Sequence, residues 1–469
     1  CIMQENCFSS IIRYSWPTDA MEATHRYALA QRNGVPSISL YYPDREDTYY
    51  FGWALANSWG QLLTATAEGI DMSGFEKKYR AFERNHKNIL QEQNKQADIA
   101  FYFSMKTRDY VKNSAQKCMN SLVVWMQAAY FSNQAFSMVF ESDTCEILDR
   151  YPFIVLPDVS MLSDDEFRKL KSYAANGGNL IISGIPGSFN DKGEARSINE
   201  ISSNLGIIES PYPLEEDICD GAYLDVMGDI RRNIHPLTYT HAFREDVSDA
   251  VVLRTSNGLP VGIYITFGKG HVFWTTVSAG LQKAQMLIFA DRYQRQEVRA
   301  DCPYYAVNDI LGGPGQILKA VVSNPLVQTV AWPEEWIVTC FQDSMNTRNI
   351  VHIVNVTQTL KAGEDGKVGH KDIIPAFSDT FYPPVIQHQD FRPRLRLRLD
   401  SKTGIKSVKL HTPEREDTLE LLWTVEEDRL VIDVPPRAFN GYAMIEAEKH
   451  CKIHTSACRY QRLKILLAS

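Results

Sequence analysis

Tyr151-Pro152-Phe153-Ile154-Val155-Leu156-Pro157-Asp158 leads, through Ser163-Asp164-Asp165-Glu166, to Asn176-Gly177-Gly178-Asn179-Leu180-Ile181-Ile182-Ser183-Gly184. The apolar runs 153–156 and 180–182 are continuous, as in strands that are buried on both faces. Between them, Ser163 and Glu166 form the capping-box pattern of a helix start, and Asn176-Gly177 is typical of a helix end. The order strand, helix, strand predicts a right-handed βαβ unit of a parallel sheet.

A parallel sheet of this kind usually holds its ligand at the carboxyl ends of the strands. Here the end of the second strand reads Ser183-Gly184-Ile185-Pro186-Gly187-Ser188. This segment lacks both the elbow pattern of a nucleophile and the GxGxxG pattern of a dinucleotide site. Gly268-Lys269-Gly270 lacks the spacing of a phosphate-binding loop and is most simply a hairpin turn. We expect a structural layer without a cofactor, in which Ser183 and Ser188 are not nucleophiles.

The bulk properties narrow the class of protein. A length of 469 residues predicts two to four domains. The net charge of −8 does not suggest a nucleic-acid partner, and no apolar run is long enough to span a membrane. The beginning of the chain has no signal-peptide pattern. The nine cysteines are scattered without a CxxC pair, which argues against a disulfide framework and favours the cytoplasm as the location.

The chain divides into three parts and a tail. Residues 1–96 alternate helix and strand signals, with helices expected over 20–31 and 49–68, a strand over 36–42, and a helix that begins with the capping-box pair Ser73 and Glu76. Residues 97–325 contain the βαβ unit, preceded by signals for a strand over 97–104, a helix over 114–131 and a strand over 136–140, and followed by a hairpin over 260–277.

Residues 326–448 show mainly strand signals. Strands are expected at 350–356, 392–399, 408–410, 419–423 and 430–434, separated by charged turns. This pattern predicts a small antiparallel β-sandwich. Residues 449–469 follow as a basic tail. The expected fold class is therefore mixed α/β with a C-terminal antiparallel β-sandwich.

Two groups of side chains are candidate binding sites. His450, Cys451, His454 and Cys458 cluster in the tail, but their spacing fits no common zinc pattern, so we expect no metal. Arg392, Arg394, Arg396 and Arg398 alternate with apolar residues. They predict a strand with one basic face, either solvated or at an interface, while an anion or partner surface stays open.

Carboxylate pairs are the machinery of glycoside cleavage. In a (β/α)8 barrel such pairs lie at the carboxyl ends of separate strands. The acids near the strand ends of residues 1–96 are Glu5, Asp44, Glu46 and Asp47. The sequence alone pairs no two of them, and a surface carboxylate is the simpler interpretation of each.

The order of these parts resembles the family 42 β-galactosidases. The segments that look like the trimerisation domain of that family, a flavodoxin- or amidotransferase-like layer without a nucleophile, are Ala97–Ser104, Tyr151–Pro157, Leu170–Gly178 and the closing hairpin Phe267–Val272. Val351–Asn355 and Tyr442–Ile445 resemble the β-sandwich that follows. Trp16–Asn57 is similar to the last helix-strand-helix of the family's (β/α)8 barrel.

The resemblance implies a partial (β/α)8 barrel over residues 1–96, an oligomerisation layer that forms a homotrimer, and a carbohydrate substrate. In the family, the acid/base Glu lies on the fourth barrel strand and the nucleophile Glu at the end of the seventh. This chain begins near the seventh strand, so the acid/base has no counterpart, and Glu5 matches the nucleophile by its distance from the following helix.

The first hypothesis is therefore the C-terminal part of a retaining glycoside hydrolase of β-galactosidase type. The second is a non-catalytic carbohydrate-binding or oligomerisation protein. A third, a flavodoxin-like enzyme acting on a small molecule, is disfavoured by the missing elbow and glycine patterns.

Overall fold

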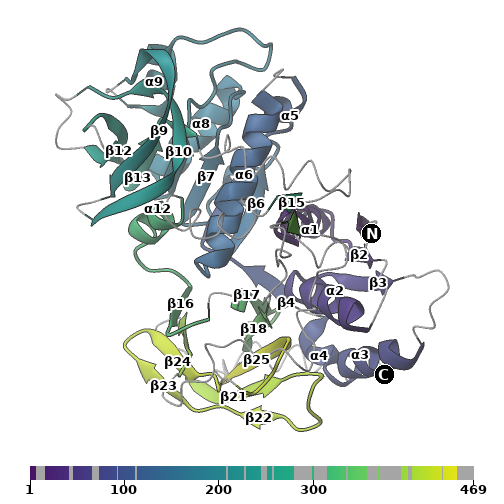
Figure 1. Cartoon of the computed structure of the whole chain (residues 1–469). Helices are drawn as coiled ribbons and strands as arrows, with labels where there is room; N and C mark the ends of the chain where they lie inside the picture. The colour runs from purple at the N-terminus through teal and green to yellow at the C-terminus, as the bar shows by residue number, and fades with distance from the viewer. Residues whose placement is uncertain are drawn as a thin grey trace, which may run out of the picture.

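A computed structural model describes residues 1–6, 16–41, 46–65, 73–91, 93–110, 114–207, 210–226, 229–244, 251–255, 258–278, 298–299, 314–333, 336–355, 367–368, 392–399, 404–435 and 437–450 (Figure 1). The chain forms a small parallel sheet with its helices, a larger α/β layer, and a pair of antiparallel sheets.

The first unit is a three-stranded parallel sheet in the order β1 (Ile2–Asn6), β2 (Ser37–Tyr41), β3 (Leu62–Ala65). It is connected by α1 (Trp16–Arg32) and α2 (Glu46–Ser58), and α3 (Ser73–Asn85) and α4 (Lys87–Leu90) follow. The strand expected over 36–42 and the helix over 20–31 are confirmed.

The helix expected over residues 49–68 is wrong in its second half, which is strand β3. The chain turns at Gly60, whose φ is +75°, a backbone conformation that favours glycine. A Cβ at Gly60 would collide with the rings of Tyr27 and Phe341. The apolar run therefore includes the turn between α2 and β3, which its hydrophobicity alone does not reveal.

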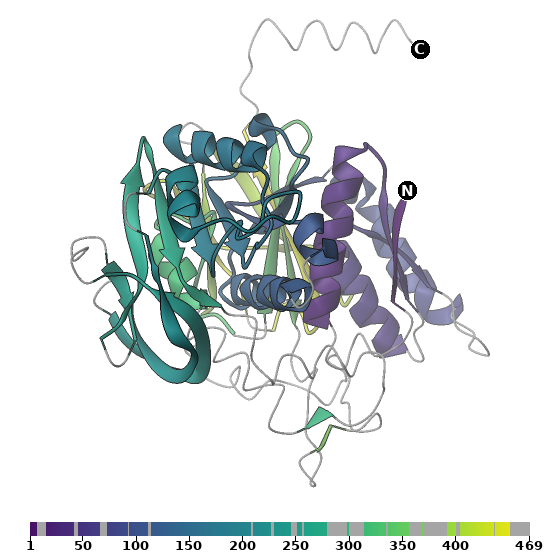
Figure 2. The ribbon, with the colours of Figure 1, turned by 90° about the horizontal axis from the view of Figure 1, so that it is seen from above.

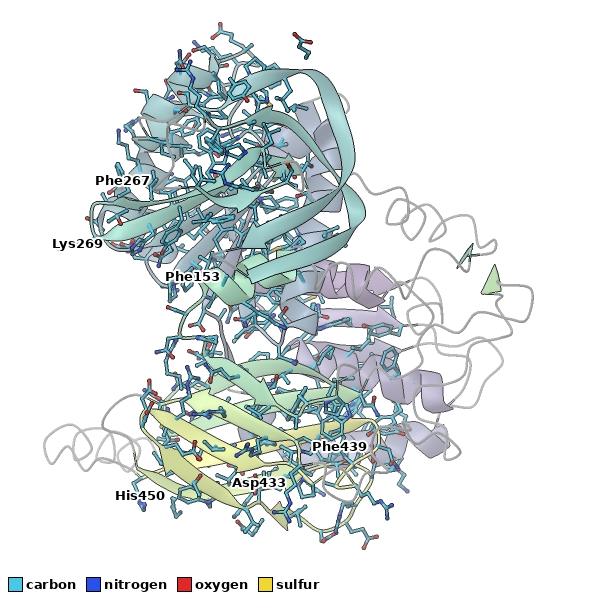
Figure 3. The ribbon with its side chains drawn as sticks, turned by 60° about the vertical axis from the view of Figure 1, so that its left-hand side comes forward. Phe153, Phe267, Lys269, Asp433, Phe439 and His450 are labelled. Carbon is cyan, nitrogen blue, oxygen red and sulfur yellow. The ribbon has the colours of Figure 1, made fainter. Side chains whose placement is uncertain are left out.

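The second unit is a seven-stranded sheet in the order β11-β12-β13-β8-β7-β5-β6. Its central strands β5 (Ile99–Phe103), β6 (Phe136–Phe140), β7 (Phe153–Pro157) and β8 (Asn179–Ser183) are parallel. β13 (Gly270–Thr275) continues the parallel order, and β12 (Pro260–Phe267) and β11 (Val251–Arg254) add antiparallel edges. Figure 3 shows Lys269 at the tip of the expected hairpin.

Helices cover both faces of this sheet. On one face, side chains of α6 (Ser114–Phe131) pack with Phe101 and Val155, and on the other, side chains of α8 (Asp164–Ala175) pack with Ile154 and Leu180. The capping box of Ser163 and Glu166 is confirmed at the start of α8. The shorter helices are α5 (Met105–Tyr110), α7 (Cys145–Leu148), α9 (Ile198–Leu205) and α12 (Pro314–Val321).

Two smaller sheets complete this region. β9 (Tyr212–Val226) and β10 (Asp229–Ala242) pair antiparallel, with β14 (Val277–Ser278) beside β10. β15 (Val298–Arg299) pairs with β19 (Lys367–Val368).

The third unit contains two antiparallel sheets that share one apolar core. The larger has the order β22 (Leu419–Glu420), β21 (Ile405–His411), β25 (Tyr442–Lys449), β18 (Arg348–Asn355), β17 (Trp336–Asp343), β4 (Gln93–Gln96). The smaller has the order β16 (Val327–Val330), β20 (Arg394–Arg398), β24 (Arg429–Asp433), β23 (Trp423–Glu426). The expected β-sandwich is thus confirmed as a fold.

The larger sheet departs from the sequence prediction at β4 and β25, its first and last strands in chain order. β4 lies at the end of the part predicted over residues 1–96, before the α/β layer in the sequence, yet it pairs with β17 of the sandwich. β25 extends to Lys449, which is buried, so the first residue of the predicted tail belongs to the sheet. Residues 451–469 lie outside the described part of the chain.

The units are packed against one another. Helix α1 lies between the three-stranded sheet and the α/β layer (Figure 2), and the His25 ring on α1 lies 4.7 Å from that of Phe103. Polar side-chain contacts that join the units are Arg32 with Asp143, Tyr50 with Glu414, and Arg398 with Asp98.

Candidate active site

The carboxyl edge of the three-stranded sheet is the candidate active site. On β2, alternate residues point to opposite faces. The Ser39 hydroxyl bonds to the Gln61 side chain, whose amide donates to Ser37 Oγ at 2.9 Å, and the ring of Tyr41 packs against Gly52 of α2. These residues fix the buried face of the sheet, which is turned toward the helices.

The opposite face is apolar and open. It carries Ile38 and Leu40 of β2, which are half-buried. The residues paired with Ile38 are Met3 on β1 and Leu62 on β3, which are 50% and 56% exposed. An exposed apolar strip across a parallel sheet is unusual, because such sheets are normally covered on both faces.

Glu5 is the penultimate residue of β1 and pairs with Leu40 in the parallel register. This backbone position places Glu5 at the carboxyl edge of the sheet. The side chain of Glu5, Asp44, and the side chains of Glu46 and Asp47 at the start of α2 lie outside the described part of the chain.

Behind this sheet lies a cluster of aromatic side chains. Tyr49, Tyr50, Trp53 and Tyr79 have ring centroids 5.0–6.0 Å apart, and each is at most 6% exposed. Such rings form a core, so these residues are not a sugar-stacking platform on the surface. The cluster is anchored by Trp53 Nε1, which donates to Glu83 at 2.9 Å.

Arg80 joins this cluster to the end of β3. Its guanidinium donates to Glu76, to Glu83 and to the carbonyl oxygen of Leu63 at 2.9–3.1 Å. Burial alone would lower the pKa of Arg80, but the Glu83 carboxylate outweighs it and raises that pKa. Arg80 thus stays charged and holds β3 in place.

A hollow of about 380 Å³ lies at the strand ends of the α/β layer. Asp158, Ser188 and Arg196 are among the residues that line it. Ser183 is fully buried next to it. The Ser183 hydroxyl accepts from Trp125 Nε1 at 3.3 Å and from the Asp158 amide at 3.2 Å. Ser188 donates to the carbonyl oxygen of Ile185 at 3.0 Å. Both hydroxyls therefore serve the local structure.

Arg196 lines this hollow and is held by ion pairs and hydrogen bonds. Its side chain is 3% exposed and pairs with Asp164 at 2.5 Å and Glu200 at 3.3 Å. It also donates to the carbonyl oxygens of Leu162 and Phe189. No sequence pattern identified this role, because the partners come from separate segments.

Asp158 adopts a left-handed conformation, with φ +50°. A Cβ at the neighbouring Gly184, whose φ is +70°, would collide with the Asp158 carboxylate. This strand end therefore requires glycine at position 184. The quoted strand sequence contains Asp158, but its backbone strain cannot be recognised from a single sequence.

The basic strand is confirmed as β20, with Leu395 and Leu397 buried between its arginines. Arg398 pairs with Asp98 at 2.7 Å, and Arg396 pairs with Glu426 at 3.5 Å. This face is thus partly an interface between units. His450 follows β25, while Cys451, His454 and Cys458 lie outside the described residues. Among the described residues, no cluster of three or more His, Cys, Asp or Glu could hold a metal.

Residues 97–200 match the model of the beta-galactosidase trimerisation domain. This part of the chain is therefore similar to that domain. No curated protein matches the chain by sequence. None of the described helices is both long and apolar enough to cross a membrane.

Several solved structures share the fold. α-L-fucosidase isoenzyme 2 from Paenibacillus thiaminolyticus has 13% identity and a TM-score of 0.58, over 90% of this chain and 62% of that one. The β-galactosidase from Rahnella sp. R3 has 11% identity and a TM-score of 0.54, over 95% and 59%. That of Bacillus circulans sp. alkalophilus has 11% identity and a TM-score of 0.50, over 92% and 58%.

These likenesses confirm the expected resemblance for the trimerisation domain by sequence and for most of the chain by fold. The chain spans about three fifths of the length of each of these structures. The TIM-barrel fold of these proteins corresponds here to the partial barrel of β1, β2 and β3, which has one strand more than the seventh and eighth strands expected from the sequence.

Proposed function

We propose that this chain is the C-terminal part of a carbohydrate-active glycoside hydrolase of β-galactosidase type, and that it carries only one carboxylate of the catalytic pair. The observation that supports this most directly is the open apolar face of Met3, Ile38 and Leu62. The inner face of a (β/α)8 barrel has this composition, and it is buried only when the remaining strands close the barrel. The trimerisation domain that follows supports the same assignment.

Glu5 is the proposed nucleophile. Its backbone position at the carboxyl edge of β1 is where the barrel fold carries catalytic residues. A retaining mechanism needs a second carboxylate about 5 Å away as acid/base. In this proposal that group comes from a strand other than β1, β2 and β3.

A panel of nitrophenyl glycosides, including the β-galactoside and the α-L-fucoside, tests the proposal on two proteins. The chain of 469 residues is expected to show no enzymatic turnover, because general acid/base assistance alone is worth about 10² to 10⁴ in rate. The product of the complete reading frame is expected to hydrolyse one of these substrates. Robust turnover by the 469-residue chain would contradict the missing acid/base.

In an active complete protein, Glu5→Ala should abolish turnover, and azide should restore it as a glycosyl azide of inverted configuration. Azide takes the place of a missing nucleophile, so a residue that only positions the substrate would not give this product. Glu420→Gln, on an exposed strand of the sandwich, is the control and should keep full activity. Unchanged activity of Glu5→Ala would exclude Glu5.

We also propose that the protein is a homotrimer held by its α/β layer, on the strength of the trimerisation-domain match. Sedimentation velocity at micromolar concentration should give the mass of three chains. A strict monomer would contradict this. If the complete protein is inactive on all glycosides but binds sugars or assembles, the alternative of a non-catalytic binding or oligomerisation protein takes its place.

A further inference from the structure

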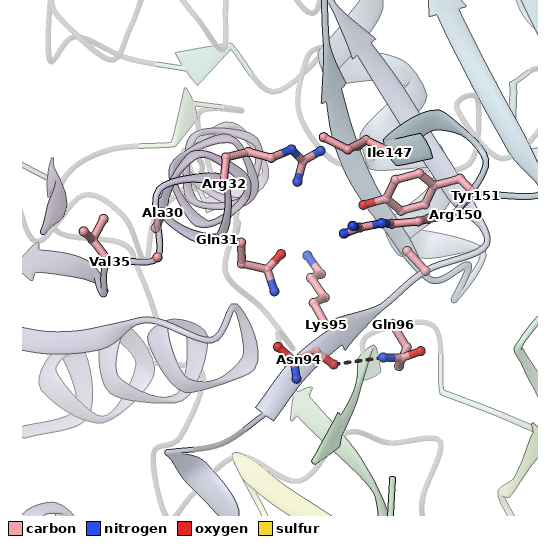
Figure 4. A pocket seen from close by; sticks show the side chains of 12 residues that line it. Ala30, Gln31, Arg32, Val35, Asn94, Lys95, Gln96, Ile147, Arg150 and Tyr151 are labelled. Atoms are coloured by element: carbon pink, nitrogen blue, oxygen red, sulfur yellow. Dashed lines mark hydrogen bonds between the residues drawn. The ribbon is translucent and has the colours of Figure 1, made fainter. Parts of the chain in front are cut away.

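A cavity of about 750 Å³ lies where the three units meet. Its wall is built by the end of α1 with the following turn, by β4, and by the segment between α7 and β7. Figure 4 shows the side chains of Gln31, Arg32, Lys95, Arg150 and Tyr151 extending toward a common space. The cavity lies at the amino end of β2, the end opposite to the proposed active site.

Lys95 is the distinctive residue of this wall. Its ammonium nitrogen is buried and has no hydrogen-bond partner among the described residues. The ring of Phe136, 5.2 Å from Nζ, offers only a cation–π contact. An ammonium without an acceptor is costly to bury, because it loses its water without gaining a partner. Lys95 itself lines the cavity, so an acceptor bound there lies within reach of its flexible side chain.

The rest of the wall is also basic. Arg150 is exposed, and none of the described lining residues is acidic. The positive charge of Arg32 is compensated by Asp143, to which its guanidinium donates two hydrogen bonds of 2.8 and 3.0 Å. The side-chain amides of Gln31 and Asn94 add further donors. The cavity is thus a concave site with several donors and an uncompensated positive charge.

We propose that this cavity binds a small oxyanion of the phosphate or sulfate class, free or carried by a monosaccharide, with Lys95 and Arg150 as its charged contacts. The volume accommodates either form. Because the wall comes from three units, the ligand would fasten them together. The proposal does not depend on the glycosidase activity proposed above.

The pH dependence of binding follows from Lys95. Burial lowers the pKa of Lys95 to about 7, and its proton is needed for pairing with an anion. The titratable groups around Lys95 are Tyr27, whose hydroxyl accepts from the Lys95 amide, then Arg32, Arg150 and Tyr151, which line the same cavity, and Cys340 on β17. Burial raises the pKa of Tyr27 to about 12 and raises that of Cys340 as well. A transition between pH 6 and 9 therefore belongs to Lys95.

Calorimetric titration and thermal unfolding with sulfate, at constant ionic strength in chloride, test the site. Sulfate keeps its charge over this pH range. We expect saturable binding at pH 6.5, a rise in the midpoint of about 2 °C at ten times Kd, and about tenfold weaker binding at pH 9. The same two measurements are made with galactose 6-phosphate and with galactose. Tighter binding of the sugar phosphate than of sulfate assigns the sugar-borne source, and the reverse assigns the free ion.

Lys95→Met should lose at least tenfold in sulfate affinity, and Arg150→Met should lose several-fold. Lys269→Met, the same change at the exposed hairpin tip, is the matched control and should bind as the unaltered protein does (Figure 3). Lys95→Met should fold well, because it removes an unpaired buried charge. Equal sulfate responses in Lys95→Met, Arg150→Met and the control would overturn the proposal, as would tight binding of neutral galactose alone.

Discussion

The molecule contains two parallel sheets that differ in how completely their faces are covered. In the larger sheet, every residue of β5 and β6 is buried, because helices cover both faces. In the smaller sheet, buried and half-buried residues alternate along β2, and Leu62 on the neighbouring β3 is 56% exposed. The larger sheet completes its own core, whereas the smaller one has a core on one face and an apolar surface on the other.

This difference shows which part of the fold buries its apolar surface by itself and which part depends on its neighbours. The smaller unit is held through α1, whose Arg32 pairs with Asp143 of the α/β layer, and through Tyr50, which donates to Glu414 beside the sandwich. Its open face has the composition of a barrel interior. At the strand ends of the α/β layer, the Ser183 and Ser188 hydroxyls bond to neighbouring groups of the layer, while the smaller sheet carries a candidate nucleophile, Glu5, at a strand end.

The largest expected effect comes from the same substitution made in each sheet. Leu180→Ala on β8 removes a side chain that is 1% exposed, and we expect a loss of about 2–5 kcal/mol in the free energy of unfolding. Leu62→Ala on β3 should change it by less than about 0.5 kcal/mol, since the side chain is 56% exposed. Urea titration followed by circular dichroism measures both. Equal losses would mean that the open face is covered in solution.

A smaller effect is expected at Glu166, which fixes α8 over the larger sheet. Its carboxylate accepts from Tyr102 at 2.6 Å, from Lys106 at 2.7 Å and from the Ser163 amide at 2.8 Å. Burial alone would raise the pKa of Glu166, but these bonds outweigh it and hold the pKa below its ordinary value. Glu166→Gln should therefore lower stability at pH 7 by about 2 kcal/mol.

The sign of the pH effect follows from that lowered pKa. Above about pH 4.5, the ordinary value, the unaltered protein has the full contribution of the charged Glu166. As the pH falls further, the unfolded chain takes up the proton first, so this contribution is lost. The stability gap to Glu166→Gln should then close. Asp165→Asn, at an exposed neighbour, is the control and should show little change at either pH.

The two sheets also differ in how far the sequence predicted them. Continuous apolar runs such as 153–156 identified buried strands, and the pair Ser163 and Glu166 identified the start of α8, because these signals are local. The sequence predicts helix where β3 lies, because the break before β3 depends on the positive φ of Gly60 and on the rings of Tyr27 and Phe341 beside it. β4 gave no signal, because a polar strand at a sheet edge is defined by its partner β17.

The candidate sites divide in the same way. Glu5 is predicted from a family resemblance, and its backbone position lies at a strand end. Lys95 lies in a polar run, Gln93–Gln96, where nothing marks it as buried. Its environment is created by α1, β6 and β17, which are distant in sequence. A single sequence shows which residues are titratable, but only the assembled fold shows which of them lack a partner.

The smallest effect is expected where the larger sheet has its strand ends. Ser188→Ala removes one hydrogen bond to Ile185 in a half-buried turn and should cost about 0.5–1.5 kcal/mol. Ser183→Ala should cost slightly more, because Trp125 Nε1 and the Asp158 amide lose a buried acceptor. Neither change should alter kcat/KM of an active complete protein on nitrophenyl glycosides, in contrast to Glu5→Ala. Loss of turnover in either serine variant, with unfolding midpoints preserved, would move the chemistry to the α/β layer and reverse the comparison.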